Sequence, residues 1–458
     1  MKHEISSELT FKRKYSFGVG ALGKDLCYQI VACYLMIYLT DTIGLAPAFV
    51  GTLFLVARVW DAFNDPVMGM IVDNTKSKYG KFRPWILVGT LINSIVLVML
   101  FTKPVNGINT YVYFSIMYIL WGMTYTIEDI SYWSMLPSLS KTKEERDTIS
   151  VIPRIFASIA GLIVGSSGLW IVNKLGNGND VVGYSRASMA VAIAFIITAL
   201  ITVINVKDKS TVVKDNIKST KQKTSIKRAI KIIWENDQLK VFIGVVLCYN
   251  LVVQFYTGVA IYYFKYVIGY SNMYAIFTGC AAAAEITGLF LYPVLSKLIG
   301  RLNVFRIAAF IPAFGLLLLL FAGANPFLIG ASGALCKLGS GFTLGLTTVM
   351  IADVIDYGEY KFGTRNESII ASFQTLLVKT ASAVAGWSVG VGLTIVGYVA
   401  NSVQTDATLL GMKILMICVP SVITVLSYII YKKGYKLEGE YQDKIIYELK
   451  KRRQENIA

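Results

Sequence analysis

Apolar residues fill most of the chain in long runs, and short polar segments separate these runs. Examples are Met189–Val206 and Ile307–Ala324. A run of roughly 20 apolar residues is long enough to cross the hydrocarbon core of a bilayer as a helix. The pattern predicts an all-α integral membrane protein with twelve transmembrane helices, at residues 17–39, 47–72, 85–102, 110–136, 152–172, 187–206, 241–267, 274–298, 307–323, 327–355, 369–399 and 411–431.

Composition supports the membrane assignment. Of the 458 residues, 55% are hydrophobic and only 16% are charged, and the mean hydropathy is +0.58. A soluble domain carries about 25% charged residues. The first span contains Lys24 and Asp25 and lacks a small-residue cleavage site. We therefore expect it to be retained rather than removed as a signal peptide.

The net charge of +16 is a topology signal. Most of the 44 Lys and Arg residues lie in the N-terminus, the even-numbered loops and the C-terminal tail. Cytoplasmic segments carry such an excess. We expect a multi-pass protein of a bacterial-type cytoplasmic membrane, with both termini in the cytoplasm. The basic residues predict weak attraction to anionic lipid and no binding of nucleic acid.

One long polar stretch, Lys207–Lys240, leaves six spans on either side. Its segment "SIKRAIKIIWEN" is amphipathic and predicts a short helix on the membrane surface. Two six-helix halves are typical of the major facilitator transporters. The predicted organisation is a first half, a cytoplasmic middle loop, a second half and a cytoplasmic helical tail, at residues 1–206, 207–240, 241–431 and 432–458.

The stretch "GVGALGKD" (Gly18–Asp25) resembles a nucleotide-binding loop, but it opens a membrane helix instead of following a strand. Glycines that allow close helix packing are the better interpretation.

No cofactor is expected. His3 is the only histidine, and the six cysteines lie inside apolar spans without metal-ligand or disulfide spacing. We interpret the cysteines as small buried apolar residues.

Charged and polar side chains in the second span predict a cation site. Asp61, Asn64 and Asp65 are at i, i+3 and i+4, so they share one helix face. Pro66 follows and can free a backbone carbonyl. These oxygen ligands suit a small alkali cation, and the two carboxylates could instead share a proton. The alternative is a structural salt bridge from Arg58 to Asp61, which would leave Asp65 to other partners.

The fourth span contains a stripe that predicts sugar binding. Within Tyr118–Pro137, Tyr125, Asp129 and Trp133 are at i, i+4 and i+8. A carboxylate accepts hydrogen bonds from sugar hydroxyls, while a flat ring covers an apolar sugar face. Thr126 adds an oxygen ligand for the cation. The alternative is ordinary aromatic packing, although a charged Asp inside the membrane argues against it.

Other charged residues lie within the predicted spans. Lys24 and Asp25 are adjacent, so they point in different directions and can serve different partners. Arg154 begins the fifth span. Lys379 lies in the middle of the eleventh span and predicts an ion pair with an acid of the second or fourth span, which would tie the halves together in one conformation. We interpret Lys337 as structural.

Three long motifs carry a family resemblance: "GTLFLVARVWDAFNDPVMGMIVDNTKSKYGKFRPWIL", "LWGMTYTIEDISYW" and "IADVIDYGEYKFGTRNESI". The chain resembles the glycoside–pentoside–hexuronide:cation symporters from about Tyr15 to the tail. Within that family it is most similar to the melibiose permeases. Leu344 stands where those permeases tend to carry a Trp beside the sugar.

The resemblance implies two groups of site residues. The cation site would contain Asp61, Asn64, Asp65 and Thr126. The galactoside site would contain Lys24, Asp25, Tyr125, Asp129, Trp133 and Arg154, with Lys379 near both.

We therefore expect a symporter that imports a galactoside such as melibiose with Na⁺, Li⁺ or H⁺ and catalyses no reaction. The expected partners are a small sugar, an alkali cation and membrane lipid, and a monomer is the working expectation. Three alternatives remain: a proton-coupled carrier of another glycoside, a glycolipid enzyme and a membrane sugar sensor.

Overall fold

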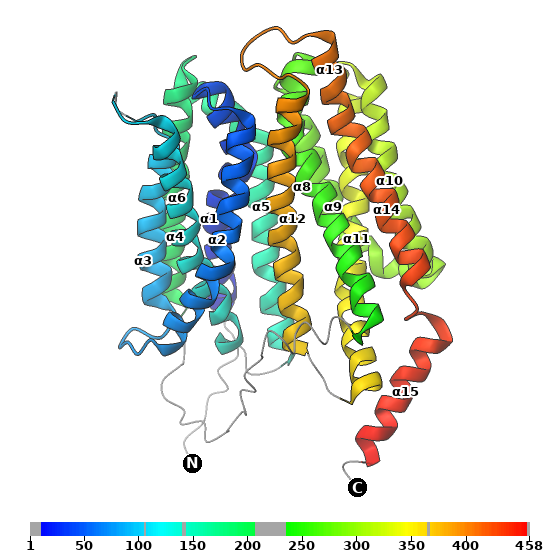
Figure 1. Cartoon of the computed structure of the whole chain (residues 1–458). Coiled ribbons are helices and arrows are strands. Elements are labelled where there is room, and N and C mark those ends of the chain that lie inside the picture. The colour runs from blue at the N-terminus through cyan, green and yellow to red at the C-terminus, as the bar shows by residue number, and fades with distance from the viewer. Residues whose placement is uncertain (1–10, 105–106, 140–142, 207–234, 364–366, 456–458) are drawn as a thin grey trace. The chain divides into compact units, whose positions relative to one another are not determined.

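The computed structural model describes residues 11–104, 107–139, 143–206, 235–363 and 367–455 (Figure 1). All regular elements of these residues are helical, which confirms the predicted all-α class. The predicted surface helix of the middle loop falls in 207–234, outside the described residues.

The first half of the chain forms long helices joined by short connections. Their bounds are α1 Phe11–Ile37, continued by a π-helical turn at Tyr38–Thr42, α2 Pro47–Asn74, α3 Arg83–Leu100, α4 Thr110–Leu139, α5 Lys143–Gly176 and α6 Asp180–Asn205.

The second half repeats this arrangement and adds a terminal helix. Its elements are α8 Asp237–Tyr262, continued by a π-helical segment at Tyr263–Ile268, α9 Met273–Ile299, α10 Arg301–Ala322, α11 Pro326–Phe362, α12 Glu367–Ile395, α13 Asp406–Lys413, a π-helical turn at Ile414–Cys418, α14 Val419–Gly434 and α15 Gly439–Glu455. The segments α13, Ile414–Cys418 and α14 form one continuous span.

Each of the twelve predicted spans overlaps a described helix, together with its π-helical continuation where there is one. Ten of the described helices are long and apolar enough to cross a membrane on length and composition alone. The helices α2 and α4 are not among those ten, and they are the two that carry the predicted cation ligands and the aromatic stripe. Polar and charged groups inside a membrane are energetically costly, so their presence in α2 and α4 indicates a functional role.

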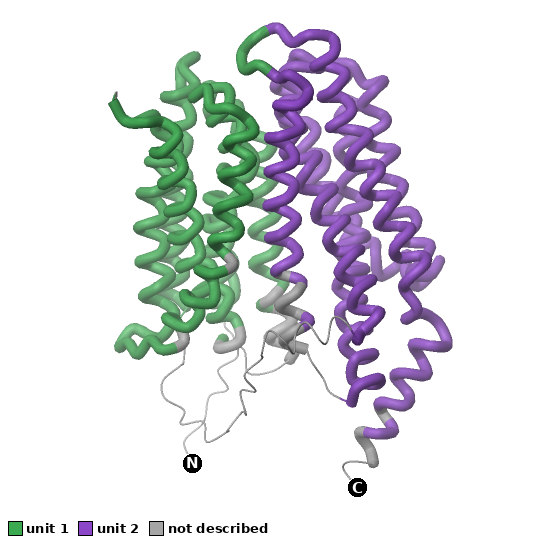
Figure 2. Tube along the Cα trace, in the orientation of Figure 1, with its two compact units in different colours: residues 1–215, 399–402 green, residues 216–398, 403–458 purple. Residues whose placement is uncertain are grey.

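The chain divides into two compact units (Figure 2). Unit 1 comprises residues 1–215 with 399–402, and unit 2 comprises residues 216–398 with 403–458. In unit 1, α1 packs on α5 and α6, while α4 packs on α2 and α3. In unit 2, α11 packs on α9 and α10, and α8 packs on α12 and α14.

Glycines bring α1 against α6. A Cβ at Gly20 would lie 2.4 Å from Thr202 Oγ1, and a Cβ at Gly23 would lie 1.8 Å from Thr198 Oγ1. Thr202 Oγ1 also donates to Ser16 O at 2.8 Å, so the close approach allows an interhelical hydrogen bond. The interpretation of "GVGALGKD" as a helix-packing segment is confirmed.

A buried carboxylate attaches the terminal helix α15 to unit 2. Asp353 on α11 accepts from Arg301 Nη1 at 2.6 Å, from Tyr435 Oη at 2.9 Å and from Gln442 Nε2 at 2.9 Å. Buried carboxylates need such partners. The tail thus forms a helix that packs on α11.

The cysteines require one correction. All six are free, and Cys27, Cys248 and Cys336 are buried as expected. Cys280 and Cys418 are exposed on their helices. Apolar faces of membrane helices contact lipid, so an apolar environment does not require burial in protein.

Candidate functional site

An aromatic pair connects α1 to α4. The rings of Phe17 and Tyr132 stack at 4.3 Å between centroids, and Tyr132 Oη donates to Phe17 O at 2.5 Å. Two turns further along α1 lies Lys24, and one turn back along α4 lies Asp129. The side of α1 that carries Phe17 and Lys24 thus meets the side of α4 that carries Tyr132 and Asp129.

Lys24 forms the centre of the candidate sugar site. It is only 3% exposed, and its Nζ donates to Asp129 Oδ1 at 2.6 Å. The same ammonium lies 5.8, 5.6 and 5.1 Å from the ring centroids of Tyr125, Tyr132 and Trp133. Rings around a cation stabilise it by about 0.5–2 kcal/mol each. A buried ammonium is thus compensated by one carboxylate and three aromatic faces.

Polar groups of this site remain accessible to a ligand. The side chain of Asp129 is 32% exposed, and Trp133 is 36% exposed. Asp25 Oδ2 is buried and has no hydrogen-bond partner among the described residues. A buried acceptor without a partner costs about 1–3 kcal/mol.

The predicted cation ligands bring α2 to α4. Thr126 Oγ1 donates to Asp65 Oδ1 at 3.1 Å, and Arg58 Nη1 donates to Asp61 Oδ2 at 3.0 Å. Asn64 Nδ2 is buried and has no partner within the described part of the chain. The alternative salt bridge of Arg58 and Asp61 is therefore present, and Asp65 contacts α4 instead. A hydroxyl, an amide and carboxylates are oxygen ligands of the kind that hard cations prefer.

A glycine allows the second contact between these helices. A Cβ at Gly122 on α4 would lie 3.2 Å from Asp61 Oδ1, so any larger residue would crowd that carboxylate. Helix α4 carries residues of both predicted sites: Thr126 of the cation group (Asp61, Asn64, Asp65 and Thr126), and Tyr125, Asp129 and Trp133 of the sugar group. Thr126, a predicted cation ligand, and Tyr125, a predicted sugar residue, are adjacent in the sequence.

Two polar residues in this region are not part of either predicted group. Asn93 on α3 is fully buried; it accepts from Cys27 Sγ at 3.1 Å and donates to Trp121 O at 2.9 Å. Glu128 on α4 is 1% exposed. The signal for both is a polar residue inside an apolar span. The stripe of i, i+4 and i+8 positions does not include Glu128, because it points to a neighbouring face.

The other two predicted sugar residues are Arg154 on α5 and Lys379 on α12. Arg154 on α5 is exposed, and its guanidinium makes no hydrogen bond or ion pair with described residues. Lys379 is half-buried on α12, in unit 2. Its pairing with an acid of the first half stays a prediction. The structure therefore brings together Lys24, Tyr125, Asp129 and Trp133, and separately Asp65 and Thr126.

Lys337 has a partner within unit 2. Its Nζ lies 3.0 and 3.1 Å from the two carboxylate oxygens of Glu285, which joins α11 to α9. This bidentate contact fits the structural interpretation of Lys337. The two helices pack closely around it, since a Cβ at Gly341 would lie 2.4 Å from Glu285 O.

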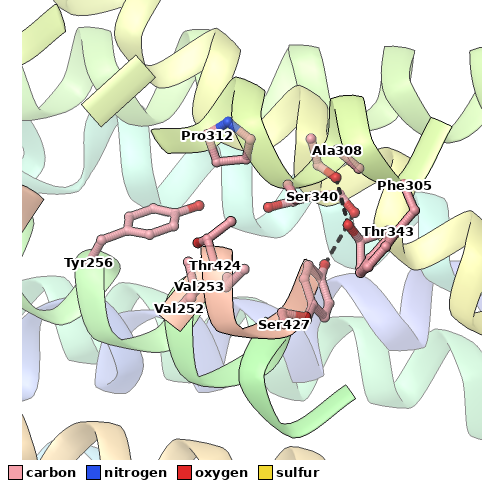
Figure 3. A pocket seen from close by; sticks show the side chains of 13 residues that line it. Val252, Val253, Tyr256, Phe305, Ala308, Pro312, Ser340, Thr343, Thr424 and Ser427 are labelled. Atoms are coloured by element: carbon pink, nitrogen blue, oxygen red, sulfur yellow. Dashed lines mark hydrogen bonds between the residues drawn. The ribbon is translucent and has the colours of Figure 1, made fainter. Parts of the chain in front are cut away.

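Unit 2 also contains a small cavity of about 30 Å³ between α8, α10, α11 and α14 (Figure 3). Tyr256, Ser340, Thr343, Thr424 and Ser427 contribute its polar lining. This volume accommodates one or two water molecules, whereas sugar-sized ligands need pockets of about 300 Å³ or more. None of the predicted site residues lines it. We therefore place the candidate sugar site at the Lys24–Asp129 pair and not at this cavity.

A family model described as "MFS/sugar transport protein" matches residues 16–439. The chain belongs to this family. It is therefore a multi-pass membrane transporter of the major facilitator superfamily and not an enzyme.

Two curated relatives extend over nearly the whole chain. The isoprimeverose transporter of Lactiplantibacillus pentosus is 29% identical over 446 residues, which cover 95% of this chain and 92% of the relative. The raffinose carrier protein of Pediococcus pentosaceus is 28% identical over 453 residues, which cover 95% of this chain and 71% of the relative. The chain thus resembles sugar carriers along its whole length.

A solved structure supports the fold. The D-xylose–proton symporter has a TM-score of 0.68 at 13% identity, and the match covers 93% of this chain and 98% of that one. At this identity the likeness shows the fold alone.

Proposed function

We propose that the protein is a Na⁺-coupled symporter that imports a galactoside such as melibiose by alternating access. Both termini would lie in the cytoplasm. The observation that carries the proposal is the Lys24–Asp129 pair, in which a third of the acid is exposed beside the exposed ring of Trp133. A carboxylate beside an aromatic face suits a galactoside, whose hydroxyls donate and whose apolar face stacks.

The adjacent cation group explains how coupling would arise. Asp65 and Thr126 join α2 to α4, and α4 also carries Asp129. A cation bound at Asp65 would hold α4 in place and so favour sugar binding, and linkage requires the sugar to favour the cation equally. The raffinose carrier supports a galactoside, because raffinose contains galactose joined to glucose as melibiose does.

Uptake of labelled melibiose into proteoliposomes tests the proposal. An inward Na⁺ gradient should drive accumulation, and a Na⁺ ionophore should abolish it. Equal uptake in Na⁺ and K⁺ buffers would contradict Na⁺ coupling.

A second candidate is a proton-coupled carrier of another glycoside, and the isoprimeverose transporter supports the choice of another glycoside. It predicts uptake of a xylose-containing disaccharide driven by a pH gradient in the same vesicles. Competition between that sugar and labelled melibiose ranks the two substrates directly.

The ring of Trp133 should contribute to sugar affinity mainly through its face. We expect Trp133→Phe to weaken melibiose binding about threefold and Trp133→Ala to weaken it about tenfold, because an aromatic contact stabilises by roughly 0.5–1.5 kcal/mol. Titration calorimetry in detergent measures both affinities.

Trp170→Ala is the matched control for this experiment. Trp170 is a 61% exposed Trp in the same half, with Lys174 Nζ 4.7 Å from its ring, and it is outside the site. Its removal should leave binding unchanged. Equal losses in Trp133→Phe and Trp133→Ala would show that the indole N–H, and not the ring face, matters.

A further inference from the structure

Two basic side chains lie on the outer surface of unit 2 without an acidic partner. Arg306 is exposed on α10, five residues or about 8 Å beyond the first residue of that helix. Lys432 is exposed in the last turn of α14. Neither residue forms an ion pair with a described residue. A charge on a membrane helix is costly unless its side chain reaches the interface or gains a counterion there.

A tyrosine joins the two helices beside these charges. Helix α10 packs on α14 (Figure 1). Arg306 Nε donates to Tyr428 Oη at 3.2 Å, and the rings of Phe310 and Tyr428 lie 5.4 Å apart between centroids. Lys432 is at i+4 from Tyr428, so the two residues lie on the same side of α14. Both basic residues are therefore next to Tyr428, where α10 meets α14.

The polar groups around Tyr428 have donors left for a ligand. The hydroxyl oxygen accepts from Arg306, and its O–H donates to no acceptor within the described part of the chain. Arg306 uses only its Nε–H in that bond, and a guanidinium has five N–H groups. A guanidinium, an ammonium and a phenol with free donors form a set that suits a phosphate group.

An apolar stripe begins at Arg306 and continues along α10. Phe310, Phe314, Leu317 and Phe321 follow Arg306 at i+4, i+8, i+11 and i+15, and all four side chains are exposed. This spacing keeps them on one face of the helix. The stripe suits the acyl chain of a lipid, because apolar helix faces are stable against hydrocarbon. Phosphate-binding groups at one end of an apolar stripe match the two parts of a phospholipid.

The charges favour an anionic lipid over other occupants. A zwitterionic lipid carries its own cation, which the Arg306 and Lys432 side chains would repel. A dissolved phosphate ion would bind the same donors but would leave the apolar stripe of α10 unused. Basic groups between membrane helices are known to bind the head groups of anionic lipids.

We propose that α10 and α14 bind an anionic glycerophospholipid, with its phosphate at Arg306, Tyr428 and Lys432 and an acyl chain along the stripe. The guanidinium and the Tyr428 O–H would donate to phosphate oxygens, and the ammonium would add a second positive charge. The lipid would hold α10 and α14 together at the end of α14 that leads to the terminal helix α15. This site is independent of the proposed sugar and cation sites.

Native mass spectrometry of the purified full-length protein tests the proposal. The protein is exchanged into detergent with equal amounts of phosphatidylglycerol and phosphatidylcholine that carry the same acyl chains. The parent should retain phosphatidylglycerol preferentially, and Arg306→Gln should lose this preference. Tyr428→Phe keeps the ring beside Phe310, and it should retain about tenfold less phosphatidylglycerol, as expected for one lost hydrogen bond to a charged group. Equal retention of the two lipids by the parent would overturn the proposal.

Lys297→Gln is the matched control. Lys297 is an exposed basic residue in the last turn of α9, just before α10 begins, and the variant removes the same charge as Arg306→Gln. It should retain phosphatidylglycerol as the parent does. Equal losses in Lys297→Gln and Arg306→Gln would indicate general attraction to a basic surface and would overturn the specific site. If Arg306→Gln does not fold, Tyr428→Phe and the comparison of lipids on the parent still decide the question.

Thermal unfolding separates a lipid from a free anion. A ligand that binds only the folded protein raises the unfolding temperature. Phosphatidylglycerol should raise it for the parent and not for Tyr428→Phe or Arg306→Gln, and inorganic phosphate at the same concentration should not raise it. Equal stabilisation by inorganic phosphate would assign the donors to a free anion and overturn the lipid site. These measurements use neither melibiose nor Na⁺, so their failure and the failure of the proposed function are distinguishable.

Discussion

Replacing Asp129 by alanine is expected to abolish melibiose binding and transport. Hydrogen bonds to a charged acceptor stabilise by about 1.5–3 kcal/mol each. Loss of two of them weakens binding by about 3–6 kcal/mol, or roughly 100- to 10,000-fold. The variant Asp129→Asn keeps the shape and one acceptor oxygen, so it should bind more weakly than the parent but better than Asp129→Ala. Titration calorimetry and vesicle uptake measure the loss.

The stability of Asp129→Ala can be separated from its function. Removing one member of a buried ion pair destabilises by about 3–5 kcal/mol when the remaining charge has no other partner. Here Asp25 and Glu128 also act on Lys24, so the cost should be smaller and the protein should still fold. Thermal unfolding in detergent checks this.

Asp180→Ala is the control, because Asp180 is an exposed acid in the first turn of α6. It should bind and transport as the parent does. If Asp129→Ala folds and binds melibiose with parental affinity, the sugar site lies elsewhere.

Replacing Asp65 by cysteine is expected to remove the stimulation of sugar binding by Na⁺ while leaving some sugar affinity. Asp65 accepts from Thr126 at the contact of α2 with α4, and a cation held there would couple the two helices. Coupling between two such sites is typically about 1–3 kcal/mol, so Na⁺ should raise melibiose affinity about 5- to 150-fold in the parent and have no effect in the variant. Melibiose titrations with and without Na⁺ measure the ratio.

A threonine pair provides the matched control for the cation group. Thr126→Val removes a ligand oxygen at constant shape and should weaken Na⁺ stimulation without eliminating it. Thr52→Val changes a hydroxyl that donates to Ala48 O within α2, and it should have no effect. A parental Na⁺ response in Asp65→Cys would exclude Asp65 as a cation ligand.

Local patterns were sufficient to predict the helices. The length of an apolar run fixes whether it can cross a bilayer, and every backbone polar group in lipid must be bonded within the helix. The runs at 187–206 and 307–323, for example, overlap α6 and α10, which begin earlier, at Asp180 and Arg301. The polar residues of α2 and α4 could be recognised in the sequence because they interrupt such apolar runs.

Residue spacing within one helix cannot identify which side chain on another helix is the partner. The stripe of Tyr125, Asp129 and Trp133 follows from helical periodicity, but nothing in it identifies Lys24, 105 residues away, as the partner of Asp129. That pairing depends on the fold, which places Lys24 opposite Asp129 just as it places Phe17 against Tyr132.

By itself, the sequence determined the membrane helices and the residue types of each candidate site, because both depend on the chemistry of single helices. Only the tertiary structure decided which side chain on another helix each buried polar residue contacts. It joined Lys24 to Asp129, Asp65 to Thr126 and Lys337 to Glu285, and it left Glu128 buried without a hydrogen-bond partner for Oε2 among the described residues. The physical reason is that the energy of a buried charge depends on its distance to other charges, and helix packing alone sets that distance.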